Sequence, residues 1–469
     1  MRRNAVVVLG GGPGGYEAAL VAAALGADVT VVERDGMGGA AVLTDCVPSK
    51  ALIATGGYLG RLVASAVRMG IHYRPDHDGD PTTGDPAQLG EINDRIMELA
   101  GAQSEDIRAG LKRAGVRIVK GRGRLSGPAA VAVRGADSCE QSLEADMILL
   151  ATGATPRILP TARPDGERIL TWQQVWSLRE LPQRLVVIGS GVTGAEFAQA
   201  YLHLGSNVVL VSSRDRVLPG EDPDAAALIE DVLRHRGMEV LNRSRASSMD
   251  RTAKGVLVRL EDGREIEGSH ALLAVGSVPQ TQDLGLAQVG VETGPGGHIL
   301  VDRVSRTSVR GIYAAGDCTG VLPLASVAAA QGRIAVAHAL GDAVHPLSTR
   351  GISANIFTDP EIGTVGVTQA EADARPADMR VLTMSLATNA RAKMENIPEG
   401  FVKLFARNGS NTILGGVVVA PRASELIFPI ALAVQHQLTV DQVATTITVY
   451  PSLSGSIAEA ARRLHRLDD

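Results

Sequence analysis

The sequence contains very little cysteine, with three residues among 469, at Cys46, Cys139 and Cys318. Three scattered thiols are too few for the disulfide framework of a small secreted domain, and too few for a zinc site with four protein ligands. We therefore expect a protein of the reducing cytoplasm, without a metal centre.

Basic charge is not in excess either. The formal net charge is −5, and the short run ARRLHR near the C-terminus is strongly basic only over a few residues. A protein that binds nucleic acid places many cations against the phosphates, so this charge balance argues against a nucleic-acid partner. We expect ARRLHR to end a solvated helix.

Long hydrophobic runs are also missing. The start, MRRNAVVVLGGG, places two arginines before an apolar stretch, as a signal peptide does, but glycines soon interrupt that stretch. It is well short of the roughly 20 apolar residues of a membrane-spanning helix. We expect a buried first strand and no transmembrane segment.

Glycine and aliphatic residues dominate instead. The chain has 53 glycines and 45% hydrophobic residues, of which few are aromatic. This composition is typical of an α/β protein with many tight turns. The length predicts about three domains.

The strongest organisational signal is an internal repeat. Residues 5–35 (AVVVLGGGPGGYEAALVAAALGADVTVVERD) and 185–215 (LVVIGSGVTGAEFAQAYLHLGSNVVLVSSRD) share one order: apolar strand, Gly-x-Gly-x-x-Gly, helix, second strand. In this dinucleotide fingerprint the first glycine makes a tight turn, the second lets a pyrophosphate approach, and the third packs helix on strand. The helix N-terminus then binds the phosphates. We expect two dinucleotide sites, formed by Gly10, Gly12, Pro13, Gly14 and Gly15 and by Gly189, Gly191, Val192, Thr193 and Gly194.

The two repeats differ where the second strand ends. The first ends at Glu33, a carboxylate that can accept from both ribose hydroxyls and repels a 2′-phosphate, so this site should hold FAD or NAD. The second ends at Ser212, followed by Ser213, Arg214 and Arg216, which offer hydroxyl and guanidinium groups. We expect this site to prefer NADPH over NADH. The alternative is that both arginines are solvated surface charges.

The remaining sequence predicts a loop, a helix and a further domain. Residues 72–90 are rich in proline, glycine and aspartate, which predicts an exposed loop. The apolar spacing over 91–114 predicts a helix that ends at Gly115. In residues 351–469, strand-like runs such as FVKLFA and LGGVVVA precede the helical ELIFPIALAVQHQ, which indicates another domain.

Residues 46–50 read Cys-Val-Pro-Ser-Lys. With this segment and the two fingerprints, the chain resembles the flavoprotein disulfide reductase superfamily, of the dihydrolipoamide dehydrogenase and glutathione reductase type. The likeness runs from residue 4 to about residue 462. It includes ATGATPR at 151–157, AVGSVP at 274–279, GIYAAGDCTG at 311–320, and the later stretches FTDPEIGTVG and NARAKM.

The resemblance implies an α/β fold with two Rossmann-like dinucleotide-binding domains and a C-terminal α+β interface domain. Residues 1–150, completed by 281–348, would bind FAD, and residues 151–280 would bind NADPH or NADH. Residues 349–469 would form the interface of a homodimer. One non-covalent FAD per subunit and a pyridine nucleotide substrate are therefore implied.

The resemblance also implies roles for single residues. Asp317 would accept a hydrogen bond from the ribityl chain of FAD, Ala325 would lie beside the isoalloxazine, and Gly123 would approach the adenine. Cys318, beside Asp317, is expected to be only a buried small residue. The family-like segments add Thr152 and Gly153 as cofactor contacts, with Gly276 at the nicotinamide nucleotide.

Two charged residues make chemical sense as a pair. Lys50 lies one helical turn beyond Cys46, so both can face one side of a helix, and Glu196 follows the last glycine of the second fingerprint. In the family these two positions form an ion pair beside the reactive flavin nitrogen. The lysine would favour the anionic reduced flavin, and the glutamate would keep the lysine charged. The alternative for each residue alone is a surface charge.

The chain departs from the disulfide-reducing members of the family at three positions. Those members carry two thiols in a Gly-Gly-Thr-Cys-x4-Cys run, but the first position here is Ala41, which leaves only Cys46. They also carry His-x-His-Pro-x-x-x-Glu, whose second histidine acts as acid and base. Here Tyr450 replaces that histidine and Gly455 the glutamate.

These departures remove the thiol relay and its base, but not the groups that bring NADPH to the flavin. We therefore expect negligible disulfide reduction and hydride transfer from NADPH to flavin, with the electrons then leaving directly to a small acceptor. Quinones are suitable because they are flat and accept two electrons. The pattern is similar to that of the NAD(P)H quinone reductases of the superfamily.

Three alternatives remain open from the sequence. A soluble transhydrogenase also lacks a complete thiol pair, although it usually keeps the earlier cysteine. A peroxidase or oxidase could use Cys46 as a lone thiol that cycles through sulfenic acid, whereas we expect Cys46 to be a packed, non-essential remnant. A flavoprotein that regulates a partner, or serves as a scaffold, is the third.

Overall fold

The computed structural model describes residues 3–65, 87–135 and 140–465. Cys139 and residues 72–86 of the predicted loop lie outside them. The chain forms two compact units: unit 1 (Met1–Ala51, Asn93–Arg157, Gly276–Ser348) and unit 2 (Leu52–Ile92, Ile158–Val275, Thr349–Asp469). Unit 2 holds both the second fingerprint and the C-terminal portion. The finer division into three domains stays a prediction.

Unit 1 is built on a parallel five-stranded sheet with strand order β18, β7, β1, β2, β3. Its central strand β1 is a run of aliphatic residues, as expected for a parallel sheet that is covered on both faces. The buried first strand is confirmed. The strands are β1 (Ala5–Leu9), β2 (Asp28–Glu33), β3 (Arg117–Lys120), β7 (Met147–Leu150) and β18 (Ile312–Ala314).

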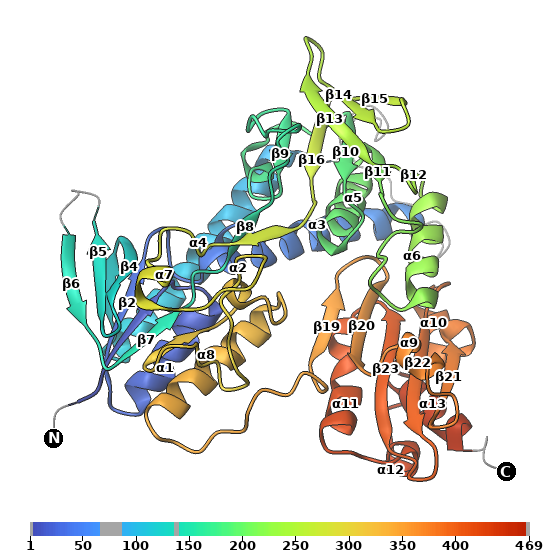
Figure 1. The fold of residues 1–469 in the computed structure, drawn as a ribbon. Helices are drawn as coiled ribbons and strands as arrows, with labels where there is room; N and C mark the ends of the chain where they lie inside the picture. Colours follow the sequence, from blue (N-terminus) through green and yellow to red (C-terminus); the bar gives the residue numbers. More distant parts are fainter. Residues whose placement is uncertain (1–2, 66–86, 136–139, 466–469) are drawn as a thin grey trace. The chain divides into compact units, whose positions relative to one another are not determined.

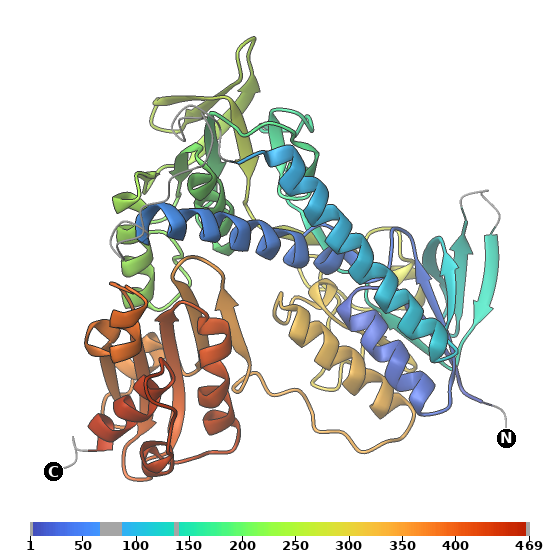
Figure 2. The ribbon, with the colours of Figure 1, turned by 180° about the vertical axis from the view of Figure 1, so that it is seen from behind.

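The two faces of this sheet have different covers. Val6 and Val8 pack with α1 (Pro13–Ala24) and α8 (Ala325–Ala339), which lie side by side in Figures 1 and 2. Val7 and Leu9 point the other way, into a core shared with the antiparallel strands β4 (Arg122–Gly127), β5 (Ala130–Arg134) and β6 (Glu140–Glu144). Smaller elements complete unit 1: α2 (Gly39–Leu43), α7 (Leu286–Val289), η2 (Asp317–Thr319), and the paired β8 (Ala154–Pro156) and β17 (Ser277–Pro279).

Two long helices, α3 (Cys46–Ser65) and α4 (Leu89–Arg113), each contain residues of both units. The helix predicted over 91–114 is confirmed, and Gly115 follows it with a φ of +80°. The predicted loop extended too far, because Leu89 is fully buried and already belongs to the helix. An apolar residue at the end of a polar stretch was the missed signal.

Unit 2 repeats the parallel arrangement, with strand order β12, β11, β10, β16, β9. Helix α5 (Val192–Leu204) follows β10, and α6 (Pro223–His235) follows β11. A three-stranded antiparallel sheet, β13 (Ala246–Arg251), β14 (Val256–Leu260) and β15 (Glu265–Gly268), shares a hydrophobic core with the parallel strands. The parallel strands are β9 (Ile169–Thr171), β10 (Arg184–Ile188), β11 (Asn207–Val211), β12 (Glu239–Leu241) and β16 (His270–Leu273); the short η1 (Val175–Ser177) follows β9.

The C-terminal portion of unit 2 is an antiparallel sheet with strand order β19, β20, β23, β22, β21. The predicted strands FVKLFA and LGGVVVA lie in β22 (Phe401–Arg407) and β23 (Ile413–Ala420), and the predicted helix lies in α11 (Ala423–Gln435). Its other elements are β19 (Ser353–Ile356), β20 (Glu361–Gly366), β21 (Met379–Ser385), α9 (Gln369–Asp373), η3 (Leu386–Thr388), α10 (Ala390–Met394), α12 (Val440–Thr445) and α13 (Gly455–His465).

A buried cation connects the two portions of unit 2. The side chain of Lys403 on β22 is 1% exposed, and its Nζ lies 2.8 Å from Oδ2 of Asp222 and 2.7 Å from Oδ2 of Asp224. The third donor reaches Oε1 of Gln369 at 3.1 Å. Asp222 also caps α6 by accepting from two backbone amides. The ammonium thus has a full set of partners, as a buried charge requires.

Candidate active site

The first glycine turn lies between β1 and α1. Gly10 has a φ of +104°, and a Cβ there would lie 2.2 Å from the carbonyl oxygen of Ala151. A Cβ at Gly15 would lie 1.9 Å from the oxygen of Gly10. These two positions therefore need glycine for the turn and for close helix packing.

The second turn, between β10 and α5, has the same geometry. Gly189 has a φ of +108°, and its Cβ would lie 2.2 Å from the oxygen of Ala274. A Cβ at Gly194 would lie 1.8 Å from the oxygen of Gly189. The sequence repeat is thus a repeat in three dimensions.

The middle glycine of each turn faces space instead of protein. The nearest described atom to a Cβ at Gly12 is 4.0 Å away, and none lies within 4 Å of a Cβ at Gly191. Gly12 and Gly191 are also the N-caps of α1 and α5, and neither helix has a side-chain cap from the described residues. Backbone amides and the positive helix end therefore border a space that suits a pyrophosphate.

Glu33 ends β2 beside the first turn. Its Oε2 accepts from the backbone amide of Gly11 at 2.6 Å, and its Oε1 accepts from that of Asp35 at 2.7 Å. The carboxylate is thereby fixed next to the glycine turn, where a ribose of a dinucleotide would lie. Gly123, on β4, was expected to approach the adenine, but packing alone also explains the glycine. A Cβ there would lie 2.5 Å from Cδ2 of Leu9.

Ser212 has a structural role in its own loop, which the sequence did not indicate. Its side chain is fully buried, and its hydroxyl accepts from the hydroxyl of Ser190 at 2.7 Å and from the amide of Arg214 at 3.1 Å. It also lies 3.2 Å from the carbonyl oxygen of Arg216. The hydroxyl therefore shapes the loop after β11, while Arg214 is exposed on that loop.

Asp317 opens η2 in unit 1. Burial raises the pKa of its carboxyl, and the nearby His298 opposes this rise. The turn before it is held by Gln331 of α8, whose Oε1 accepts from the amide of Gly316 at 2.8 Å. Gln331 was not predicted from the sequence, since its partner Gly316 lies outside α8. Cys318 is fully buried, its pKa is raised by burial, and it is a small core residue as predicted.

Thr152, Gly153 and Gly276 lie where the chain leaves and re-enters unit 1. Thr152 donates its hydroxyl proton to the carbonyl of Gln280 at 2.7 Å. Gly153 and Gly276 have φ values of +70° and +89°, and a Cβ at either would meet no described atom within 4 Å. Their backbone conformation thus explains the glycines. Ala325 is exposed at the first position of α8.

Cys46 and Lys50 lie one turn apart at the start of α3, which confirms their predicted spacing. Cys46 is partly exposed and forms no disulfide among the described residues. Ala41, where disulfide-reducing relatives have a thiol, lies in α2. Lys50 belongs to unit 1 and Glu196 to unit 2. Their pairing stays a prediction.

Glu196 is a buried carboxylate on α5, 2% exposed. Its Oε1 accepts a hydrogen bond from the backbone amide of Phe357 at 2.8 Å, from the turn that follows β19. A charged acceptor makes this bond stronger than one between neutral groups. The expected alternative of a surface charge is wrong for Glu196, because the side chain is inside unit 2.

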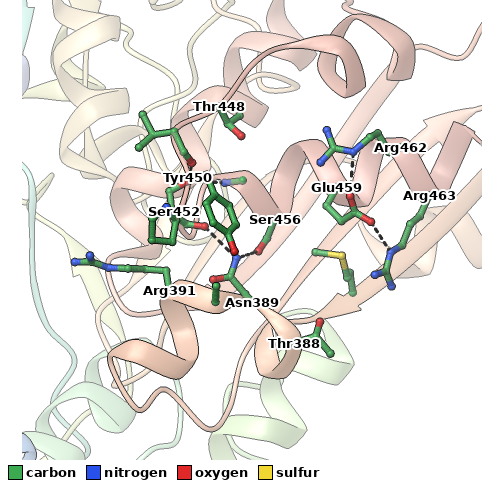
Figure 3. A pocket seen from close by; sticks show the side chains of 15 residues that line it. Thr388, Asn389, Arg391, Thr448, Tyr450, Ser452, Ser456, Glu459, Arg462 and Arg463 are labelled. Atoms are coloured by element: carbon green, nitrogen blue, oxygen red, sulfur yellow. Dashed lines mark hydrogen bonds and ion pairs between the residues drawn. The ribbon is translucent and has the colours of Figure 1, made fainter.

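Tyr450 and Gly455 border a pocket of about 390 Å³ in the C-terminal portion, shown in Figure 3. Asn389 holds the loop there, donating to the carbonyl of Ser452 at 3.0 Å and to the hydroxyl of Ser456 at 2.8 Å. Tyr450 is 85% exposed in the single chain, near Ile447 at 98% and Val449 at 76%. Such an apolar stretch is typical of a surface that a partner covers.

Comparison with known proteins agrees with this geometry. The model of the pyridine nucleotide-disulphide oxidoreductases matches residues 4–332, and the model of their dimerisation domain matches residues 352–461. The chain belongs to the pyridine nucleotide-disulphide oxidoreductase family. It is an NAD(P)H-dependent flavoprotein oxidoreductase that uses FAD, and its dimerisation domain supports a homodimer. The predicted fold class and superfamily are confirmed.

Individual relatives cover nearly the whole chain. NAD(P)H dehydrogenase (quinone) from Mycobacterium tuberculosis is 54% identical over 99% of this chain and 94% of its own length. Dihydrolipoyl dehydrogenase 2 from Haloarcula marismortui is 34% identical over 97% of this chain and 95% of its own.

Solved structures show the same fold. LpdA from Mycobacterium tuberculosis has a TM-score of 0.92 at 53% identity, covering 98% of this chain and 99% of that one. The flavoprotein disulfide reductase RclA from Escherichia coli has a TM-score of 0.85 at 22% identity, covering 97% and 99%, and shows only that the fold is shared. In the part of the chain that the structure describes, no helix has the length and hydropathy to cross a bilayer.

Proposed function

We propose that the protein is an NAD(P)H:quinone oxidoreductase without disulfide reductase activity. In the overall reaction NAD(P)H, a proton and a quinone give NAD(P)⁺ and a hydroquinone. Bound FAD would supply the redox chemistry between the nicotinamide and the quinone. The 54% identical relative named NAD(P)H dehydrogenase (quinone) supports this choice of acceptor. The cysteine-poor sequence favours a cytoplasmic location.

The two glycine turns assign the two nucleotides. We assign FAD to residues 1–150 and 281–348, where Glu33 would accept from the adenosine ribose and Asp317 from the ribityl chain. We assign the nicotinamide nucleotide to residues 151–280, and dimerisation to residues 349–469. At the second site Arg214 would bind a 2′-phosphate, held in position by the loop around Ser212. The space beside Gly12 and Gly191 supports both pyrophosphate positions.

Lys50 and Glu196 would act on the reacting ring. The ammonium of Lys50 would stabilise negative charge that builds on the isoalloxazine as it is reduced, and Glu196 would hold that ammonium in place. The burial of Glu196 supports this assignment, since a buried carboxylate is stable only with strong partners. Neither residue needs to move a proton to the substrate.

The single observation that carries the proposal is the residue at position 41. A flavin-linked disulfide needs two thiols, and the position of the first thiol is occupied by Ala41. Exchange with a substrate disulfide also needs a base, but Tyr450 and Gly455 replace the histidine and glutamate that disulfide-reducing relatives carry. Electrons that reach the flavin must therefore leave it directly.

The test is steady-state turnover of the purified holoenzyme with NADPH against a panel of acceptors. We expect turnover with benzoquinones and naphthoquinones, and at least about 100-fold lower kcat/KM with lipoamide and glutathione disulfide. Lipoamide turnover comparable to quinone turnover would overturn the proposal. Rapid hydride exchange between NADPH and NAD⁺ without any quinone would favour a transhydrogenase instead.

A further inference from the structure

Helix α5 presents two buried polar side chains to one turn of the C-terminal portion. Glu196 and Gln199 are each 2% exposed and lie three residues apart, so they share a face of the helix. Both contact the turn that joins β19 to β20, Glu196 at Phe357 and Gln199 at Asp359. All of these residues belong to unit 2.

The carboxamide of Gln199 makes a two-point contact with the backbone of Asp359. Its Oε1 accepts from the Asp359 amide at 2.6 Å, and its Nε2 donates to the Asp359 carbonyl at 2.9 Å. Both partners are backbone groups, and a side-chain amide is the group that offers one donor and one acceptor together. The contact therefore fixes both the position and the orientation of the turn.

Arg236 holds the same turn from its outer side. Its Nη1 lies 3.1 Å from Oδ2 of Asp359 and donates to the carbonyl of Asp359 at 3.0 Å. Thr358, which is buried, donates its hydroxyl proton to the carbonyl of Pro360 at 2.8 Å. Hydrogen bonds and an ion pair thus hold the turn at Asp359, which lies two residues beyond Phe357, whose amide binds Glu196.

We propose that Gln199 is a positioning residue for hydride transfer to the flavin. It holds the Phe357–Asp359 turn so that the Phe357 amide fixes the Glu196 carboxylate. This inference rests on the proposed function, because it requires that Glu196 and Lys50 assist flavin reduction. Without Gln199, the turn loses the two hydrogen bonds to Asp359, and the Glu196 carboxylate is no longer held in one orientation.

The test uses Gln199→Met, which keeps the length of the side chain and removes both polar atoms. Anaerobic stopped-flow mixing of the FAD-loaded variant with NADPH measures the limiting rate of flavin reduction without any acceptor. We expect this rate to fall about tenfold, with the apparent Kd for NADPH within about twofold of the wild-type value. A loss of positioning acts on the rate, whereas a distorted nucleotide site would raise Kd.

A matched control is Ser206→Ala, just beyond the other end of α5. Ser206 is buried and donates to the carbonyl of Pro182 at 2.6 Å, so its loss also removes a buried side chain-to-backbone bond. We expect it to lower thermal stability but to leave the rate of flavin reduction within about twofold of wild type. An equal slowing in both variants would mean that Gln199 is merely structural, and would overturn the proposal.

A double-mutant cycle with Glu196→Gln separates the two proposals. If Gln199 acts through Glu196, the effects are non-additive, and Gln199→Met slows the Glu196→Gln enzyme by less than about twofold further. Additive effects would overturn the role of Gln199. Arg236→Met, at a partly exposed position, gives a second variant if Gln199→Met does not fold, and we expect a smaller slowing that is also lost in the Glu196→Gln background.

The wild-type reaction shows which proposal has failed. If NADPH reduces the wild-type flavin and Glu196→Gln slows that reduction but Gln199→Met does not, only the role of Gln199 is wrong. If Glu196→Gln has no effect, the proposed roles of Gln199 and of Glu196 are both wrong. If wild-type flavin is not reduced by NADPH, the proposed function itself is wrong.

Discussion

The two glycine turns have nearly identical backbones but different surroundings. Their first glycines have φ values of +104° and +108°, and in each turn a Cβ on the last glycine would lie within 1.9 Å of a carbonyl oxygen. The strand ends beside them differ: the Glu33 carboxylate is hydrogen-bonded to the turn, whereas the Ser212 hydroxyl is buried under a loop that carries Arg214. On the proposed assignment, the turn would bind a dinucleotide and the strand end would select which one.

Substitution of the last glycine in each turn should have the largest effect and should affect both turns alike. We expect Gly15→Ala or Gly194→Ala to lower the free energy of unfolding by more than about 4 kcal/mol, because the Cβ would overlap a carbonyl oxygen. Thermal or chemical unfolding measures the loss. The matched control is Gly101→Ala in α4, where a Cβ meets no described atom within 4 Å and should be neutral or slightly stabilising.

The middle glycines should separate the two sites functionally. Gly12→Ala and Gly191→Ala both place a methyl group in open space, so both variants should fold. We expect Gly12→Ala to lose FAD on purification, whereas Gly191→Ala keeps FAD and raises the KM for NADPH about tenfold or more. Flavin absorbance and steady-state kinetics measure these effects. The account is contradicted if Gly191→Ala loses flavin while Gly12→Ala retains it.

Arg214 tests what the second strand end recognises. We expect Arg214→Gln to raise the KM for NADPH about tenfold, because one charge-assisted hydrogen bond to the 2′-phosphate is lost. The KM for NADH should change by less than about twofold. Arg216→Gln is the comparison on the same loop. Equal effects on both nucleotides would identify Arg214 as a solvated surface charge.

The smallest effect is expected at Cys46. Cys46→Ser removes the thiol at the start of α3 but leaves Lys50 on the same helix, so NADPH-dependent quinone reduction should change by less than about threefold. Steady-state assays with one quinone compare the two enzymes. A loss of nearly all activity would instead support an enzyme that cycles Cys46 through sulfenic acid.

Much of the fold could be predicted because its signals are local. The glycine turns, the helix that became α4 and the strands β22 and β23 each depend on periodicity or turn residues within one segment. Spacing alone also placed Cys46 and Lys50 on one helix. Such patterns need no knowledge of distant contacts.

The contacts that define the candidate site could not be predicted in the same way. Glu196 binds an amide 161 residues away, and the Ser212 hydroxyl accepts from the backbone amide of Arg214 in its own loop. A pattern indicates which residue type is present, but not which buried group it satisfies. The dependence of Gly123 on the packing of Leu9 is a further tertiary effect.

We propose above that electrons leave the flavin without a thiol carrier. The most direct test of this proposal is double mixing in a stopped-flow instrument: anaerobic enzyme is first reduced by one equivalent of NADPH, then mixed with a quinone while flavin absorbance is followed. We expect flavin reoxidation by quinone to be at least as fast as kcat, and we expect lipoamide to leave the flavin reduced on that timescale. Reoxidation by lipoamide as fast as by quinone would contradict it.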